Sequence, residues 1–323
     1  MIQSIALICV LLGAAAPAAA DPPEAEISSR FIKAKLYLPD PENGYYRATR
    51  FDWSGIISSL QYAGHEYFGV WFPRYDPKIN DAVTGPAEEF RSTDGGLGYD
   101  AAKPGGMFIR IGVGVVRKPE EQAYRPFYTY EIVDHGQWKV RRGKDRVEFT
   151  HTLASESGYA YVYRKTVRLE KNRPVMVIEH SLRNTGRLPI ETLQYNHNFF
   201  TIDKLPTGPD VSVAFAFEPK ALADLRGLAE VRGRELVFLR ALENRQSTFT
   251  GLEGFGSGAR DYDIRVENRK AKAGVRITGD RPLARLDFWS VRTTVCPEPY
   301  ISLRIEPGRK SEWKISYEFY TLP

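Results

Sequence analysis

The stretch Asn196-His197-Asn198-Phe199-Phe200 combines a titratable imidazole, two amides and two aromatic rings. A histidine has a pKa of about 6.5, so it can donate or accept a proton near neutral pH. Amides can orient the imidazole, and aromatic rings offer flat apolar surface that suits a polar, ring-shaped ligand such as a sugar. The competing interpretation is a histidine that ends a strand with its ring hydrogen-bonded.

Glu298 is the second candidate, because it stands between two prolines in Cys296-Pro297-Glu298-Pro299-Tyr300. Proline fixes its own φ and restricts the residue before it, so a glutamate followed by proline has a narrow backbone range. A carboxylate held in place is what a general base requires. The alternative is an ordinary loop glutamate on the surface between two strands.

The elements that must position these groups are β-strands, since most of the chain alternates between apolar and polar residues. In residues 158–169, Tyr161, Tyr163 and Lys165 share one face and Val162 and Arg164 the other. This period of two is typical of half-buried strands. About sixteen such segments predict an all-β fold, a large antiparallel two-sheet β-sandwich, in preference to a barrel.

Four segments need separate interpretation. Residues 21–29 are polar and proline-rich, which predicts a flexible lead-in to a single domain over 30–323. Residues 46–53 are assigned to an early strand, and 221–231 to a short peripheral helix. Residues 73–106 are dense in Gly, Pro and Asp, which leaves open a functional loop, disorder or an unrecognised strand.

The first twenty residues resemble a secretory signal peptide. They contain no charged side chain, an apolar core at residues 5–12, and Ala18-Ala19-Ala20 just before Asp21. We therefore expect cleavage near Ala20 and a periplasmic or secreted protein. No later run of about 18 apolar residues exists, so the mature form is expected to have no membrane anchor.

Charge and composition narrow the possible ligands. The net charge is +5, and the 45 basic and 40 acidic residues are interspersed, which gives no case for nucleic acid but would tolerate or attract acidic glycans. The chain has no His-x-x-x-His, no cysteine pair after cleavage and no acidic calcium loop, so no metal site is predicted. No glycine-rich segment lies in a strand-to-helix setting, and no cofactor is expected. The oligomeric state stays open.

The two candidate stretches, in this order, resemble those of the aldose 1-epimerase (galactose mutarotase-like) family. Residues 196–200 look like the family's Asn-His-x-Tyr-Phe stretch, and Cys296-Pro297-Glu298-Pro299 looks like its Cys-x-Glu-Pro/Thr stretch. A Pro307-Gly308 turn and a final strand follow, as in the family. The resemblance implies a two-sheet supersandwich that binds sugars without a cofactor.

By this resemblance, His197 is the acid that protonates the ring oxygen and Glu298 the base that removes the anomeric hydroxyl proton. The ordinary pKa values of glutamate and histidine, about 4.3 and 6.5, suit a carboxylate and a partly protonated imidazole. The candidate substrate-binding residues are Asn196, Asn198, His135, Arg91, Phe200 and Tyr300.

Two of these residues stand in for family features that the sequence lacks. Lys103-Pro104-Gly105-Gly106 occupies the place of the family's Leu-His-Gly-Gly stretch and has no histidine. His135 is therefore the candidate second histidine, and Arg91 the candidate sugar-binding arginine. His65, His151 and His180 are interpreted as structural.

The sequence thus predicts an exported aldose 1-epimerase-like isomerase that acts on a monosaccharide or oligosaccharide. Two alternatives remain open: a lyase or hydrolase on the same fold, and a non-catalytic glycan-binding protein.

Overall fold

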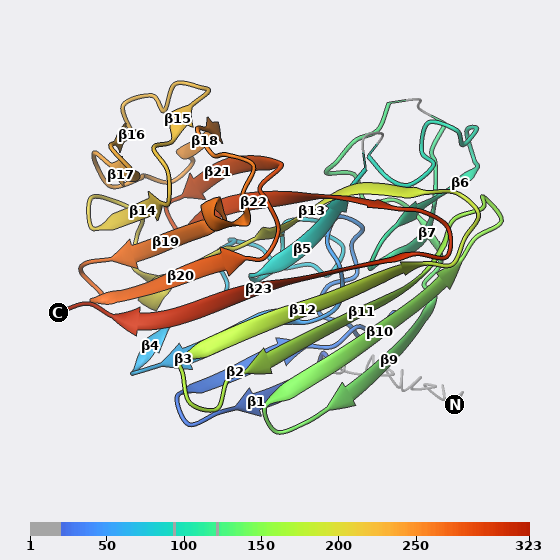
Figure 1. Cartoon of the computed structure of the whole chain (residues 1–323), viewed down its shortest axis with the longest axis horizontal. Helices are drawn as coiled ribbons and strands as arrows, with labels where there is room; N and C mark the ends of the chain where they lie inside the picture. The colour runs from blue at the N-terminus through green and yellow to red at the C-terminus, as the bar shows by residue number, and fades with distance from the viewer. Residues whose placement is uncertain (1–20, 93–94, 121–122) are drawn as a thin grey trace, which may run out of the picture.

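Two large antiparallel sheets dominate the computed structural model of the chain, which describes residues 21–92, 95–120 and 123–323 (Figure 1). The expected signal peptide lies outside the described residues. Every strand pair within the sheets is antiparallel, which confirms the predicted all-β sandwich. The described residues contain no α-helix, and two short 3₁₀ helices occur, η1 (Ile202–Lys204) and η2 (Ala259–Asp261).

The larger sheet forms the broad front layer in Figure 1. Its ten strands, in spatial order, are β16 (Ala229–Arg232), β17 (Glu235–Phe238), β14 (Val211–Phe215), β19 (Asp263–Asn268), β20 (Ala273–Gly279), β23 (Lys310–Thr321), β12 (Val175–Asn184), β11 (Ala160–Leu169), β10 (Arg146–Ala154) and β9 (Gln137–Arg142).

Three smaller sheets complete the part of the chain that the structure describes. The six-stranded sheet has the order β15 (Lys220–Ala221), β18 (Ser247–Glu253), β21 (Arg285–Val291), β22 (Thr294–Ile305), β13 (Ile190–His197) and β5 (Ala87–Arg91). The four-stranded sheet has β1 (Glu24–Ser28), β2 (Ile32–Tyr37), β3 (Ile56–Tyr62) and β4 (His65–Glu66), and the three-stranded sheet β6 (Met107–Arg110), β7 (Gly114–Arg117) and β8 (Ile132–Asp134).

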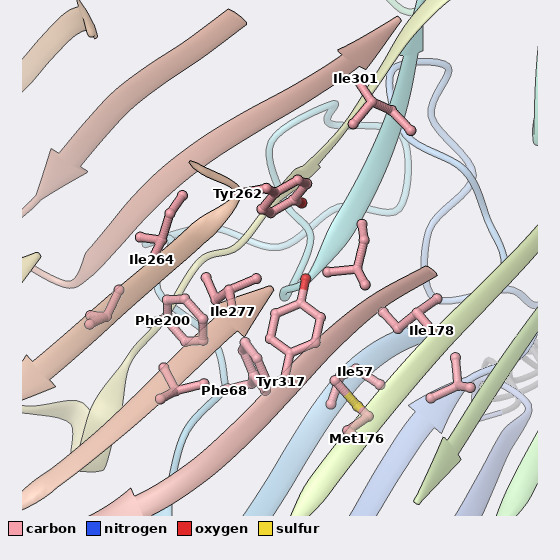
Figure 2. Close-up of a cluster of buried hydrophobic side chains, with 14 of the residues drawn as sticks. Ile57, Phe68, Met176, Ile178, Phe200, Tyr262, Ile264, Ile277, Ile301 and Tyr317 are labelled. Carbon is pink, nitrogen blue, oxygen red and sulfur yellow. The ribbon is translucent and has the colours of Figure 1, made fainter. Parts of the chain in front are cut away.

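The main core lies between the ten-stranded sheet and the six- and four-stranded sheets. Alternation supplies it: Tyr161, Tyr163 and Lys165 of β11 are all buried, as their shared face predicts. Figure 2 shows part of this core, where Tyr317 of β23 lies among aliphatic and aromatic side chains from several strands.

A second, separate cluster covers the other face of the six-stranded sheet. It is built mainly from irregular segments and the three-stranded sheet, and its largest members include Trp53, Phe51, Tyr46, Tyr99 and Phe108. Phe199 and Cys296 connect this cluster to the ends of β13 and β22. The two candidate stretches therefore lie where the sheet meets a layer of loops.

Several sequence predictions were wrong in detail. The lead-in at 21–29 is not a flexible tail, because β1 pairs with β2 and buries Ala25 and Ile27. The helix expected at 221–231 is a turn between β15 and the start of β16. Residues 46–53 form no strand although they are largely buried, and the region 73–106 contains β5.

Candidate active site

Four neighbouring strands bring the candidate residues together on one face of the six-stranded sheet. Glu298 of β22 is paired with Asp287 of β21. On the other side, Tyr195 of β13 is paired with both Tyr300 of β22 and Glu89 of β5. Directly paired residues of antiparallel strands share a face. The face therefore carries alternating charged and aromatic side chains across β21, β22, β13 and β5.

The two prolines of β22 lie where its ladder with β13 is interrupted. Regular pairing ends at Tyr195 and Tyr300, and the strands meet again at the Phe200–Val295 bridge. Proline lacks the N–H group that a central strand normally donates, so it fits only where that bond is not needed. The side chain of Asn198 fills the gap by donating to the carbonyl oxygen of Pro297, at 2.7 Å.

The side chains of His197 and Glu298 contact each other within this interrupted part of the β13–β22 pair. The Nε2 atom of His197 lies 3.2 Å from Oε1 of Glu298, and both side chains are buried. The Tyr300 hydroxyl donates to the second oxygen of Glu298 at 3.3 Å. The structure thus places side by side two groups that are 101 positions apart in the sequence.

Aromatic packing, rather than the flanking amides, orients the imidazole. The ring of His197 stacks on Phe199 at 3.8 Å, and Phe51 and Trp289 meet it edge-on. Among the described residues, Nδ1 of His197 has no hydrogen-bond partner. Phe199 holds its position with φ at +38°, a strained value for an aromatic residue and one that is common near functional sites.

Burial shifts the two pKa values in opposite directions. Desolvation raises the pKa of Glu298 to about 8, with Arg50 opposing the shift and Asp287 and Glu89 adding to it. Desolvation, together with the positive charge of Arg50, lowers the pKa of His197 well below its usual value. At pH 7 the pair therefore consists of a carboxylic acid and a neutral imidazole. This reverses the protonation states expected from the ordinary pKa values of the two residues, but the pair still holds one proton.

Arg50 is the arginine that the structure places beside this pair. Its guanidinium donates to Glu89 at 3.0 Å and to the hydroxyl of Tyr195 at 3.0 Å, and it also pairs with Asp81. Glu89 accepts a further bond from Arg110 at 3.1 Å, and its pKa is lowered to about 2 because the attraction of these arginines outweighs the cost of burial. Arg50 was not among the residues predicted from the sequence, where Arg91 was the candidate sugar-binding arginine; both arginines line the cavity described next.

An open cavity of about 300 Å³ lies above the pair. It is lined by Arg50, Trp71, Asp81, Arg91, Phe127, His197, Phe199, Phe249, Arg285, Asp287, Trp289, Glu298 and Tyr300. Phe127 and Phe249 remain 64% and 55% exposed, so they offer aromatic surface to a ligand. Flat apolar rings beside charged groups suit a sugar, which presents both C–H faces and hydroxyls.

The other predicted site residues divide into two groups. Tyr300 and Arg91 line the cavity with His197 and Glu298. Asn196 and Asn198 do not, because strand alternation directs both to the opposite face, where each hydrogen-bonds the hydroxyl of Tyr317. The structure therefore does not bring these two predicted substrate-binding amides to the cavity, and Asn198 instead bonds the backbone next to Glu298.

Phe200 and His135 also lie away from the cavity. Phe200 stacks on Phe68 in the main core, as Figure 2 shows. His135 lies in the turn between β8 and β9, where its ring packs near Trp53 and its carbonyl oxygen is 2.9 Å from His151. His135 therefore does not replace the family's second histidine, and His197 is the one histidine among the described residues that line the cavity.

One sequence signal could have identified more of the site. Arg285, Asp287 and Trp289 occupy alternate positions of a strand whose other face is Leu286 and Phe288. Two charged residues and a tryptophan on the face of a strand opposite its apolar face indicate a binding surface. Nothing comparable marks Arg50, Asp81 or Trp71, which lie in irregular segments and reach the cavity only through tertiary folding.

A buried charged cluster supports the site from below. Glu88 of β5 lies 3.1 Å from Lys165 and 2.9 Å from His180, and Lys165 also lies 3.3 Å from Asp52. Burial alone would raise the pKa of Glu88, but attraction to His180 and Lys165 outweighs it and lowers this pKa to about 2. Adjacent residues of β5 thus serve two purposes, because Glu88 faces the main core and Glu89 faces the cavity.

No family model matches the sequence, and no curated relative matches it either. Solved structures do match. A galactose mutarotase-like protein from Lactobacillus casei is 11% identical with a TM-score of 0.56, covering 92% of this chain and 100% of that one. A galactose mutarotase related enzyme from Lactobacillus acidophilus is 13% identical with a TM-score of 0.56, covering 92% and 97%.

An aldose epimerase homologue from C. elegans gives the same picture, at 13% identity, a TM-score of 0.53 and coverage of 94% and 100%. The chain therefore has the fold of the galactose mutarotase-like superfamily. This is the fold that the sequence resemblance implied. Within the described residues, no helix has the length and apolar character needed to cross a bilayer, and no cluster of three or more metal-binding side chains is found.

Proposed function

We propose that the protein is an aldose 1-epimerase-like enzyme that interconverts sugar anomers with His197 and Glu298 as its proton-transfer pair. The observation that carries this proposal is the 3.2 Å contact between the buried imidazole and carboxyl group at the base of an open, aromatic-lined cavity. Fold likeness alone does not assign a reaction, so the proposal rests on this geometry.

Anomer exchange needs one proton delivered to the ring oxygen and one removed from the anomeric hydroxyl. In the resting state, Glu298 holds the proton and donates it to the ring oxygen, while Nε2 of His197 accepts the hydroxyl proton. The bond between C1 and the ring oxygen breaks, and C1 becomes a carbonyl. The pair is then a carboxylate and an imidazolium, which attract each other at close range.

Rotation about the C1–C2 bond presents the other face of the carbonyl to the ring oxygen. The reverse proton transfers then close the ring and restore the resting pair. This assignment exchanges the acid and base roles that the sequence resemblance implies, because burial favours the neutral form of both groups. Tyr300 holds Glu298 in place through its hydrogen bond, and the side chains of Arg50 and Tyr300 contact hydroxyl groups of the sugar.

Saturation-transfer NMR of anomeric exchange, at low buffer concentration, tests the proposal. Hexoses, pentoses, uronic acids and reducing oligosaccharides are compared with wild type, His197→Asn and Glu298→Gln. We expect acceleration by the wild type and a loss of about 10²- to 10⁴-fold in each variant. Sugar binding without acceleration would contradict the proposal and favour a glycan-binding protein.

We also propose that the chain is exported and cleaved after Ala20. Cleavage there leaves β1 intact, since β1 begins at Glu24 and its buried residues start at Ala25. Amino-terminal sequencing of the exported protein should give Asp21 as the first residue. A retained Met1 would contradict this.

A further inference from the structure

The cavity above His197 and Glu298 continues into a second hollow. This neighbouring hollow has a volume of about 480 Å³ and shares two lining residues with the first, Arg91 and Arg285. Its other polar lining consists of Ser92, Thr192 and Ser302 and of Glu191 and Arg304, which form an ion pair with each other. The binding surface therefore does not end at the proposed catalytic pair.

The direction of this extension follows from the register of β22. Glu298, Tyr300 and Ser302 occupy alternate positions of the strand and share one face. With a rise of about 3.3 Å per residue, Glu298 and Ser302 are about 13 Å apart along the strand. That distance exceeds one pyranose ring, so a sugar bound at Glu298 leaves room for a second unit over Ser302.

The arginines in and beside the two hollows differ in how far neighbouring carboxylates neutralise their charges. Arg50 and Arg110 contact Glu89, and Arg50 also pairs with Asp81. Arg285 is neutralised by a two-point contact with Asp287, at 2.9 and 2.6 Å, and lies over the ring of Tyr300.

The guanidinium of Arg91, at the junction of the two hollows, makes no hydrogen bond or ion pair with any residue that the structure describes. Its most strongly attracting neighbour, Glu89, already serves Arg50 and Arg110. The second hollow is lined by three arginines, Arg91, Arg285 and Arg304, and by one carboxylate, Glu191, which pairs with Arg304. The excess positive charge lies where the second sugar unit would be placed.

We propose that the substrate is an acidic disaccharide or oligosaccharide, whose reducing-end unit lies at His197 and Glu298 and whose next unit places a carboxylate against Arg91. The position of the reducing end rests on the proposed function. A planar guanidinium matches a carboxylate through two parallel hydrogen bonds, which gives orientation as well as affinity. Arg285 lines the same hollow, and Ser92, Thr192 and Ser302 hydrogen-bond hydroxyl groups of the second sugar unit.

The test compares anomer exchange for four kinds of sugar in the gluco, galacto and manno series: (1→4)-linked diuronides, neutral disaccharides, monouronic acids and hexose 6-phosphates. Wild type is compared with Arg91→Gln, and Arg164→Gln is the matched control because Arg164 is exposed on β11 of the other sheet. We expect Arg91→Gln to raise KM for the diuronide about 10- to 100-fold, since a charged hydrogen bond is lost. The KM for neutral disaccharides should rise less than the KM for the diuronide, because a neutral sugar has no carboxylate partner to lose, and Arg164→Gln should change kcat and KM less than about twofold.

Three outcomes would separate the parts of this proposal. Equal KM values for diuronides and neutral disaccharides, unchanged by Arg91→Gln, would overturn it and leave the epimerase function intact. An Arg91-dependent preference for 6-phosphates and monouronic acids but not for diuronides would overturn the placement of the second unit. Diuronide binding that depends on Arg91 in calorimetry, without any anomer exchange, would support the acidic-glycan site and contradict the epimerase function.

Discussion

His197 and Glu298 differ from free histidine and glutamate because a buried site penalises charge. Both groups favour their neutral forms, yet the pair retains one proton, which is the number that a single acid and a single base require. A proton transfer from the acid to the substrate creates two charges that lie close to each other. The arrangement therefore makes the charged state of the pair an intermediate rather than the resting state.

The pH dependence of activity should report these shifted values. Activity requires the one-proton state, so the rate should fall on the alkaline side as Glu298 loses its proton near pH 8. On the acid side it should fall only well below pH 6.5, where His197 gains a second proton. A pH–rate profile and the ¹³C carboxyl shift of labelled Glu298 measure both limbs. Titration of Glu298 near pH 4.5 would contradict a resting state in which this carboxyl holds the proton.

Replacing Glu298 with glutamine should stabilise the folded protein at alkaline pH. The pKa of Glu298 is raised from 4.5 to about 8 in the folded protein. The stability that the wild type has below pH 4.5 is therefore lost progressively as the pH rises from 4.5 through 8. Glutamine cannot ionise. The Glu298→Gln variant should therefore exceed wild type by roughly 2 kcal/mol or more in free energy of unfolding at pH 8, since each pKa unit corresponds to about 1.4 kcal/mol.

Urea unfolding at pH 4 and pH 8 measures this effect. The gap between Glu298→Gln and wild type should close at pH 4. Glu235→Gln, at an exposed position of β17, is the control and should show no such pH dependence. A Gln variant less stable than wild type at both pH values would contradict the raised pKa of Glu298.

At the scale of the elements, alternation along the strands was the reliable signal. It predicted β11 together with its buried face, since a period of two needs no knowledge of the partner strand. It failed for β5, where Glu88 and Glu89 are both buried because cations meet them from two sides. It also failed for Arg50, which lies in a buried loop whose position depends on tertiary contacts.

The first strand provides a test at this scale. Ile27 of β1 is buried in the main core, whereas its neighbour Glu26 is exposed and makes only a surface ion pair. Ile27→Ala should lower the free energy of unfolding by about 2–5 kcal/mol, the usual cost of a core truncation. Glu26→Ala should change it by less than about 1 kcal/mol. Equally small changes in the free energy of unfolding for both variants, measured in urea, would show that residues 21–29 are a flexible lead-in after all.

At the scale of the whole molecule, the sheets are joined by charge as well as by apolar packing. Lys165 of the ten-stranded sheet contacts Glu88 of the six-stranded sheet and Asp52 of the loop layer. Asn196, Tyr317 and Asn198 continue this polar contact between the layers up to the backbone of Pro297. The site is thus supported by both halves of the sandwich.

Removing the cation from this cluster should be costly. Lys165→Met leaves Glu88 and Asp52 buried with less compensation, and breaking such a pair typically costs about 3–5 kcal/mol in free energy of unfolding. Arg164→Met, the exposed neighbour on β11, is the control and should have little effect. Chemical denaturation at pH 7 makes the comparison. A loss under about 1 kcal/mol for Lys165→Met would show that the cluster does not stabilise the fold.

The most direct test of the central claim is the rate of anomeric exchange in the double variant His197→Asn/Glu298→Gln, beside both single variants and the wild type. Groups that act as one unit give losses that do not add. We predict that each single change removes nearly all the acceleration, and that the double variant is no slower than the slower single variant. Independent, additive losses, or full activity in either single variant, would contradict a proton-transfer pair formed by His197 and Glu298.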